Sequence, residues 1–184
     1  MSLSYTDVKT ALDKASAATG GKFKPFDVNY YLSKNPDVAS GYAGDPLKHY
    51  VEIGAAEGRM PSAWFDGAFY RTYYAAKDPG ILTLSGADLL VHYAMFGAAE
   101  GRAPSAAFQN FDGARYLSDN PDVATYVNAN LSSFNGSVTN GAIAHYVEFG
   151  ALEGRKAFDV TGVQLASVAP QSLTLTPTTA GSTT

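Results

Sequence analysis

The sequence predicts a mostly α-helical fold: three short-helix repeats packed in series, with an N-terminal capping helix and a Ser/Thr-rich C-terminal tail. Two observations predict this class. The block HYVEIGAAEGR at 49–59 recurs as HYAMFGAAEGR at 92–102 and as HYVEFGALEGR at 145–155. Upstream of each block, a Phe-Asp pair followed by an aromatic-rich segment marks the start of a helix. Self-similarity of this kind is typical of proteins built from repeated supersecondary units.

Composition narrows the class of protein. The chain has 184 residues, of which 46% are hydrophobic and 16% charged, which is enough apolar content for a packed core. A net charge of −4, with scattered Lys and Arg, argues against a non-specific nucleic-acid binder. The absence of cysteine excludes disulfides, thiolate catalysis and zinc–thiolate sites. We expect no membrane span and no ordinary N-terminal secretion signal, because no sufficiently long apolar run is present.

The chain divides into a leader, three repeat units and a tail. The expected ranges are 1–25 for the capping helix, 26–165 for the repeat domain with units at 26–64, 65–110 and 111–157, and 166–184 for a linker or flexible tail. In the leader, Val8, Leu12 and Ala15 share one helix face, which we expect to cover the first repeat. A fourth Phe-Asp pair, at 158–159, leads into a different pattern.

Each unit opens with a predicted helix start. The aspartates of the Phe-Asp pairs are expected N-caps, whose carboxylates accept bonds from free backbone N–H groups. The preceding Phe and a Tyr four positions into the helix would then form a hydrophobic staple. The aspartates are Asp27, Asp66 and Asp112, and the staple tyrosines are Tyr31, Tyr70 and Tyr116.

A second short helix is predicted in units one and three. Both contain Asn-Pro-Asp-Val, at 35–38 and 120–123, where Asn would cap the helix and Pro would take its first position. Unit two lacks this motif and carries RTYYAAKDPG instead.

The repeated block itself is predicted to be a closing helix. Its buried stripe has apolar residues at i, i+3 and i+4: Leu47, Tyr50 and Val51; Leu90, Tyr93 and Ala94; Ile143, Tyr146 and Val147. Gly54, Gly97 and Gly150 are expected just after the helix, in a positive-φ position that favours glycine.

The three histidines, His49, His92 and His145, lie at the edge of this stripe. One interpretation makes each a metal ligand or general base. One His per unit, without an HxxxH or HxxE partner, gives no local chelate. We therefore favour a structural ring, packed at the seam between repeats with one nitrogen bonded to the backbone.

Three arginines recur at the end of the block, two residues after a glutamate. A guanidinium is a planar fork of donors suited to carboxylates and sugar hydroxyls. Each Arg either holds its own turn and pairs with a repeat aspartate, or contributes to a ladder that grips an extended anionic or polyhydroxylated polymer. With the aromatics that could stack on sugar rings, the candidate ligand-binding residues are Arg59, Arg102, Arg155, Trp64, Tyr73 and Tyr74; the aromatics are more often core residues.

Metal binding has weak support in the sequence. Asp37, Asp45 and Asp122 are oxygen donors in turns, which would suit calcium, yet no calcium-loop spacing is present. Capping explains these aspartates better. No catalytic or nucleotide-binding motif appears, so we expect no enzyme activity.

The unit FD…YYL…NPDV…DPL.HYVE.GA.EGR.PS resembles a helical repeat of large bacterial proteins exported by the type I route. These are of the repeats-in-toxin kind and include S-layer-like surface proteins, and the repeat also accompanies some glycosyltransferase domains. The resemblance covers 26–155, and unit two departs from it at NPDV. The resemblance implies a non-catalytic helical module on the extracellular bacterial cell surface. Because such proteins are calcium-dependent, it also makes calcium the one ion that this chain could bind.

Three functions are weighed. The first is a cell-surface anchoring or assembly module that binds envelope polysaccharide (lipopolysaccharide) or neighbouring subunits, including copies of itself. The second is an accessory carbohydrate-binding domain of a carbohydrate-active enzyme. The third is a small hydrolase that combines His and Glu from different repeats, which requires these groups to come within hydrogen-bond reach.

Overall fold

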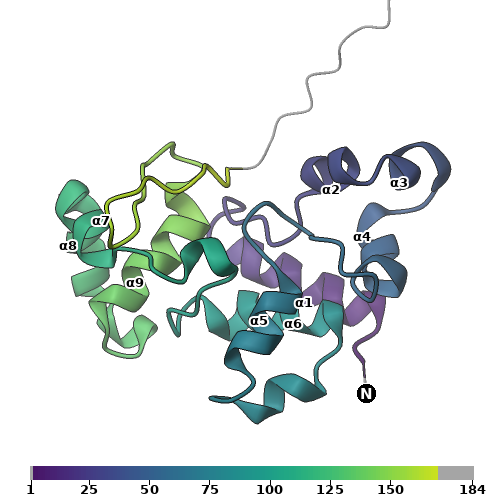
Figure 1. Ribbon diagram of the computed structural model, residues 1–184, viewed down its shortest axis with the longest axis horizontal. Helices are drawn as coiled ribbons and strands as arrows, with labels where there is room; N and C mark the ends of the chain where they lie inside the picture. The colour runs from purple at the N-terminus through teal and green to yellow at the C-terminus, as the bar shows by residue number, and fades with distance from the viewer. Residues whose placement is uncertain (1, 170–184) are drawn as a thin grey trace, which may run out of the picture.

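Helix α1 (Tyr5–Ala18) runs behind the repeat units through the middle of the molecule (Figure 1). Ser4 caps it by accepting from the backbone N–H of Asp7, whose carboxylate in turn accepts from the Ser4 N–H, as in a capping box. Val8, Leu12 and Ala15 form its buried face, as the leader pattern predicts. The computed structural model describes residues 2–169.

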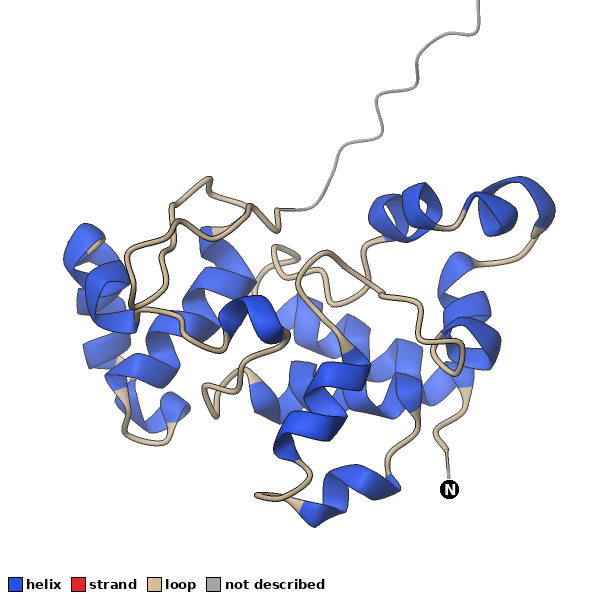
Figure 2. Ribbon diagram, in the orientation of Figure 1, coloured by secondary structure: helices blue, strands red, loops and turns tan. Residues whose placement is uncertain are grey.

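The described chain is mostly helical and contains no strand, only two isolated antiparallel bridges (Figure 2). Unit one contains α2 (Val28–Lys34), α3 (Pro36–Gly41), α4 (Pro46–His49) and the π-helical turn η1 (Tyr50–Gly54). Unit two contains α5 (Gly67–Tyr74), the 3₁₀ turn η2 (Pro79–Thr83), α6 (Gly86–His92) and the π turn η3 (Tyr93–Gly97). The 3₁₀ turn η4 (Ala106–Phe108) precedes unit three, which contains α7 (Gly113–Asp119), α8 (Pro121–Ala129), the 3₁₀ turn η5 (Leu131–Phe134), α9 (Val138–His145) and the π turn η6 (Tyr146–Gly150).

The predicted helix starts are confirmed in all three units. Asp27 accepts from Tyr30 N at 3.1 Å, and Asp66 and Asp112 make the equivalent bonds at 3.0 and 2.9 Å. The staples are formed by ring pairs with centroids 5.2 to 5.6 Å apart: Phe26–Tyr31, Phe65–Tyr70 and Phe111–Tyr116. Each unit therefore starts from the same local geometry.

The end of each unit returns to its own start. The Asp27 N–H donates to the Pro61 carbonyl at 3.0 Å, and the Asp66 N–H donates to the Pro104 carbonyl at the same distance. In unit three, the Asp112 N–H donates to the Phe158 carbonyl at 2.9 Å. The fourth Phe-Asp pair is thus not the start of a further repeat. It closes unit three, and the Asp159 carboxylate accepts from Thr161 and Val163 in a tight turn.

The leader is more central than the sequence suggested. Helix α1 packs against α4 and η1 of unit one and more extensively against α6 and η3 of unit two. The Tyr5 hydroxyl donates to Asp45 of unit one at 2.6 Å, and the Leu3 N–H donates to Asp88 of unit two at 3.0 Å. After the helix, Lys22 reaches Glu153 of unit three at 3.5 Å. The expected cover for one repeat is a shared support for three, because no repeat is large enough to bury its apolar face alone.

The C-terminal segment stays packed further than predicted. Leu165 N donates to the Ala157 carbonyl, and Val168 is buried, so part of the expected tail at 166–184 belongs to the folded domain. The rest of that tail, 170–184, lies outside the described residues. Among the residues that the structure describes, no helix has both the length and the apolar character needed to cross a bilayer.

Asp112→Ala should destabilise the domain by about 0.5–2 kcal/mol, because the N–H of Arg115 loses its cap. The measurement is urea unfolding followed by circular dichroism. Asp119→Ala at the other end of α7 is the control, since Asp119 makes only an exposed pair with Arg115. An equal effect of the two substitutions would contradict the capping role.

Candidate functional site

The repeated letters Tyr, His and Gly meet in one cluster per unit. The Tyr31 hydroxyl and His49 Nδ1 are hydrogen-bonded at 2.9 Å. Units two and three repeat this bond at 3.0 Å: Tyr70 with His92, and Tyr116 with His145. This geometry agrees with the structural interpretation of the histidines, although the hydrogen bond of Nδ1 is to a tyrosine and not, as expected, to the backbone. Each His bonds to the staple tyrosine of its own unit rather than at a seam between units.

The glycines of this cluster have a different role from the one predicted. Gly54, Gly97 and Gly150 do not have positive φ; they end the π turns, where a Cβ would lie 2.1, 2.5 and 2.2 Å from the tyrosine hydroxyl. The positive φ belongs to the glycines of the Glu-Gly-Arg motif: Gly58, Gly101 and Gly154. The first glycine is therefore required by the close approach of a side chain and the second by the turn.

Burial lowers the pKa of His92 and of His145 below the ordinary histidine value. Burial also raises the pKa of Tyr31 to about 12. Burial likewise raises the pKa of Tyr70 and of Tyr116, so in units two and three the neutral form of both rings of the pair is favoured. Within residues 2–169, no histidine is hydrogen-bonded to a carboxylate, a serine or a threonine.

The three arginines each bind acids of their own unit. Arg59 donates from Nε to Glu57 at 2.7 Å and from Nη1 to Asp37 at 2.8 Å and to Asn35 at 2.9 Å. Arg155 makes the same bonds to Glu153, Asp122 and Asn120. The hydrogen bond from each Arg lowers the pKa of Asp37 and of Asp122. The geometry agrees with the structural interpretation of the arginines, and ligand binding by them stays a prediction.

The Asn and Asp side chains of the Asn-Pro-Asp motif accept hydrogen bonds from this arginine. Asn35 and Asn120 precede α3 and α8 as expected, with Pro at the first helical position, but their side chains do not cap the helix. Each amide instead donates back to a tyrosine carbonyl and accepts from the arginine. In unit two, Arg102 has only Asp78 and Glu100, and its Nη1 is buried without a hydrogen-bond partner in the described part of the chain.

The candidate metal ligands do not gather. Asp37 and Asp122 pair with arginines, and Asp45 caps α4 while accepting from Tyr5. Among residues 2–169, no group of three or more His, Cys, Asp or Glu side chains could hold a metal ion.

The aromatic candidates lie mostly inside. Trp64 is 4% exposed and packs against Phe23, Phe65 and Tyr93, so its faces are not open to a sugar ring. Tyr74 is buried, and its hydroxyl accepts from Ala103 N at 2.7 Å. Tyr73 lies between Phe69, stacked at 5.1 Å, and the Lys77 ammonium, 5.3 Å from its ring centroid. These contacts explain the Tyr-rich runs as packing.

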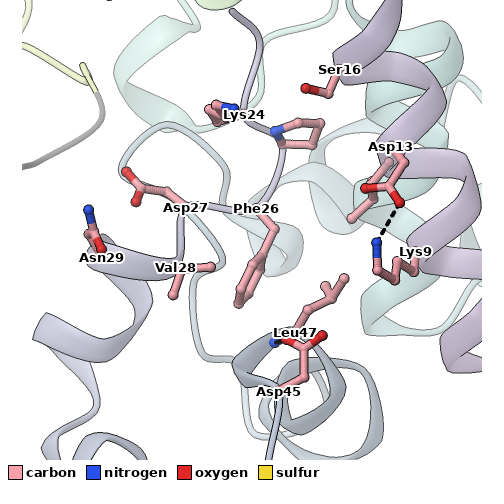
Figure 3. A pocket seen from close by; sticks show the side chains of 12 residues that line it. Lys9, Asp13, Ser16, Lys24, Phe26, Asp27, Val28, Asn29, Asp45 and Leu47 are labelled. Atoms are coloured by element: carbon pink, nitrogen blue, oxygen red, sulfur yellow. Dashed lines mark hydrogen bonds and ion pairs between the residues drawn. The ribbon is translucent and has the colours of Figure 1, made fainter. Parts of the chain in front are cut away.

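A groove that no sequence motif indicated lies between α1 and unit one. We call it the α1 groove; its volume is about 470 Å³. Its lining comes from α1, from the segment before α2 and from the start of α4: Lys9, Leu12, Asp13, Ser16, Lys24, Pro25, Phe26, Asp27, Val28, Asn29, Asp45 and Leu47. Figure 3 shows the Phe26 ring and Leu47 pointing into the hollow, with the Lys9–Asp13 pair across from them on α1.

The chemistry of the α1 groove is mixed. Leu12 and Leu47 are buried and give it an apolar floor, and Phe26 supplies one aromatic wall. Two ammonium groups, Lys9 and Lys24, and the carboxylate of Asp13 stand on its rim. A concave site with an apolar surface and a few convergent polar groups is the usual form of a small-molecule site. The sequence did not indicate it because its walls come from the leader and unit one. Among its lining residues only Asp45 was a candidate ligand, whereas Leu12, Phe26, Asp27 and Leu47 were assigned to packing and capping.

Comparisons with known proteins find no match: no protein-family model, no curated protein and no solved structure aligns significantly with the chain. The functional proposal therefore rests on the geometry of the sites and on the resemblance of the repeat unit.

Gly150→Ala should destabilise the domain by about 1–3 kcal/mol, because the new Cβ collides with the Tyr116 hydroxyl. The cost should be smaller in a Tyr116→Phe background, where the hydroxyl is absent, which a double-mutant cycle on unfolding free energies measures. Gly41→Ala is the control, since nothing lies within 4 Å of its Cβ. Strict additivity of the two changes would show that the contact is not the cause.

Glu148 occupies a repeated position that differs between units. Its equivalents are the exposed Glu52, which pairs with Lys48 at 3.8 Å, and Met95. Glu148 is partly buried, and no cation pairs with it in the described residues. Burial raises its pKa from 4.5 to about 7. Below about pH 7, the protonated form of Glu148 is therefore favoured in the folded state.

The contribution of Glu148 to stability should fall by about 1–3 kcal/mol between pH 5 and pH 8, because its folded pKa lies above the unfolded one and ionisation is costlier in the folded state. Over this range the arginine-bound aspartates, whose pKa values are lowered, stay ionised, whereas His92 and His145, whose pKa values are also lowered, act in the opposite direction to Glu148. The effect of Glu148 is therefore measured as a difference: the unfolding free energy of Glu148→Gln relative to the unchanged protein should rise with pH, and that of Glu52→Gln should not. Equal slopes for Glu148→Gln and the unchanged protein would refute the assignment.

Proposed function

We propose that the chain is a non-catalytic anchoring or assembly module of a bacterial surface protein, and that it binds envelope polysaccharide through the α1 groove. The surface setting rests on the resemblance of the FD…NPDV…HYVE.G..EGR unit to repeats of type I-exported, S-layer-like proteins. The ligand class rests on the groove.

The observation that carries the proposal is the Phe26 ring facing polar side chains of α1 across a hollow (Figure 3). A sugar ring has apolar C–H faces and a rim of hydroxyls. Its face would lie on Phe26 and Leu47, and its hydroxyls would donate to Asp13 and accept from Lys9 and Lys24. The volume of about 470 Å³ falls in the range of small-ligand sites and suits one or two sugar residues.

Binding fits these residues better than catalysis does. The Asp13 carboxylate is paired with Lys9, and Asp45 accepts hydrogen bonds from Leu47 N and the Tyr5 hydroxyl. Both carboxylates are thus occupied by donors of the protein itself. The histidines lie in separate units, each bonded to a tyrosine, which argues against the hydrolase hypothesis.

The recurring arginines support the scaffold in this proposal. Their side chains are only 15 to 22% exposed and are held by acids on two sides. The groove itself is lined by residues of α1, of the segment between α1 and α2, and of unit one. Calcium enters through the resemblance alone, since no group of three or more His, Cys, Asp or Glu side chains lies together among residues 2–169; we propose that polysaccharide binding by this chain does not require it.

The Asp13→Ala/Lys24→Ala double variant should bind purified envelope polysaccharide about tenfold or more weakly than the unchanged protein, by isothermal titration calorimetry. Both residues are exposed, so the melting temperature should not change. Lys14→Ala, also exposed on α1 but outside the groove, is the control and should bind normally.

The same titration with a chelator should give unchanged affinity. Normal polysaccharide binding by the double variant would refute the groove as the site. Concentration-dependent self-association without any polysaccharide binding would favour neighbouring subunits as the partner instead.

A further inference from the structure

A second cavity, of about 550 Å³, lies between units one and two; we call it the seam cavity. One wall is the end of unit one, from η1 to the Glu-Gly-Arg turn, and the other is formed by the first turns of α5 and α6. It is lined by Tyr50, Ala55, Ala56, Gly58, Arg59, Gly67, Ala68, Arg71, Thr72, Ser85, Gly86 and Leu89. Half of these residues are Gly or Ala, so a ligand can come close to the backbone.

The charged side chains that line the seam cavity are both cationic: Arg59 and Arg71. Its other polar side chains are hydroxyls, those of Thr72, Ser85 and Tyr50, and the lining contains no carboxylate. The seam cavity differs in this respect from the α1 groove, whose lining contains both ammonium groups and carboxylates. A cavity with guanidinium and hydroxyl donors and no acid on its walls favours an oxyanion.

Arg59 is held in a fixed position at this site. Its Nε and Nη1 are bound by Glu57, Asp37 and Asn35, and the side chain keeps 22% exposure. No bond from Nη2 is seen in the described part of the chain, whereas the Nη2 of Arg155 donates to Asp122. Because two carboxylates balance the charge of Arg59, it offers oriented donors more than net charge.

Arg71 supplies the uncompensated charge. It stands where the other units have Leu32 and Leu117, which pack partly against the core. Arg71 is exposed and donates from Nη2 to the Leu82 carbonyl at 2.8 Å, and no acid pairs with it within residues 2–169. Since the other two units form with a leucine at this position, the fold of the repeat does not require an arginine there.

The corresponding seam between units two and three is narrower. Its cavity, lined in part by Gly101, Thr139 and Ile143, has a volume of about 210 Å³. A Cβ at Gly101 would lie 2.3 Å from the Asn140 side chain, whereas nothing lies within 4 Å of a Cβ at the equivalent Gly58. Counted from the N-cap, Asp88 takes in α6 the position of Asn140 in α9, and its carboxylate accepts from the N–H groups of Leu3 and Ser85.

We propose that the seam cavity binds an acidic sugar, through a carboxylate or phosphate held by Arg71 and the Arg59 guanidinium, with the sugar ring against the Gly and Ala walls. This deepens the proposed function, on which it rests for the sugar part of the ligand. Thr72 and Ser85 add hydroxyl donors. The planar fork of Arg71 suits two oxygens at once, which a lysine would not match.

The test is a titration of ¹⁵N-labelled protein followed by NMR, with tri-galacturonate, glucose 1-phosphate, inorganic phosphate and neutral maltotriose as probes. Amide shifts should appear at Gly58, Gly67 and Gly86 with the acidic sugars and not with maltotriose. Comparing the first two probes distinguishes a carboxylate from a phosphate source, and inorganic phosphate shows how much the sugar contributes.

Arg71→Leu, which copies the residue of units one and three, should keep the melting temperature and weaken acidic-sugar binding about tenfold or more. Arg71→Lys should bind with intermediate affinity. Lys14→Leu removes the same charge far from the cavity and is the matched control, and the Asp13→Ala/Lys24→Ala variant should bind the acidic probes normally even though its α1 groove is impaired. Equal loss in Arg71→Leu and Lys14→Leu, or no shift at the three glycines with any acidic probe, would overturn the proposal.

Discussion

The fold depends on a tyrosine hydroxyl that lies directly against a glycine. In each unit, the staple tyrosine crosses from the opening helix to the closing helix, bonds to the histidine and reaches the last residue of the π turn. A π turn widens the helix by one residue and is rare outside special sites. Here it places the glycine under the hydroxyl, and the backbone that follows can then position the arginine. The helix, the turn and the arginine pair all depend on this one contact.

Units built in this way need an external surface on which to pack. Helices of four to nine residues are too short to be stable alone, so their apolar faces must be covered by neighbours. Helix α1, at 14 residues, is the longest described helix and contacts units one and two, and the loop after it reaches unit three. The same helix forms one wall of the α1 groove, so this proposed binding site is a consequence of where the leader lies.

Differences between the units are as informative as the shared letters. Unit two lacks the Asn-Pro-Asp motif, and the buried Nη1 of its Arg102 has no hydrogen-bond partner within residues 2–169. It also carries Arg71 where the others carry leucine. The shared residues build the frame, and the proposed sites lie where α1 or a unit-specific residue interrupts the repetition.

The sequence by itself determined the helical class, the aspartate caps and the Phe–Tyr staples, because these depend on local interactions between residues a few positions apart. It also placed the buried stripes, since a helix period can be read from spacing. It could not place the histidine's partner or the glycine's role, because each depends on a residue 18 to 34 positions away in another helix. The tertiary structure alone decided where α1 packs, that the fourth Phe-Asp pair closes unit three, and that the two cavities exist. A cavity is the space left where segments distant in the sequence pack against one another. Residue spacing within one segment therefore cannot predict it.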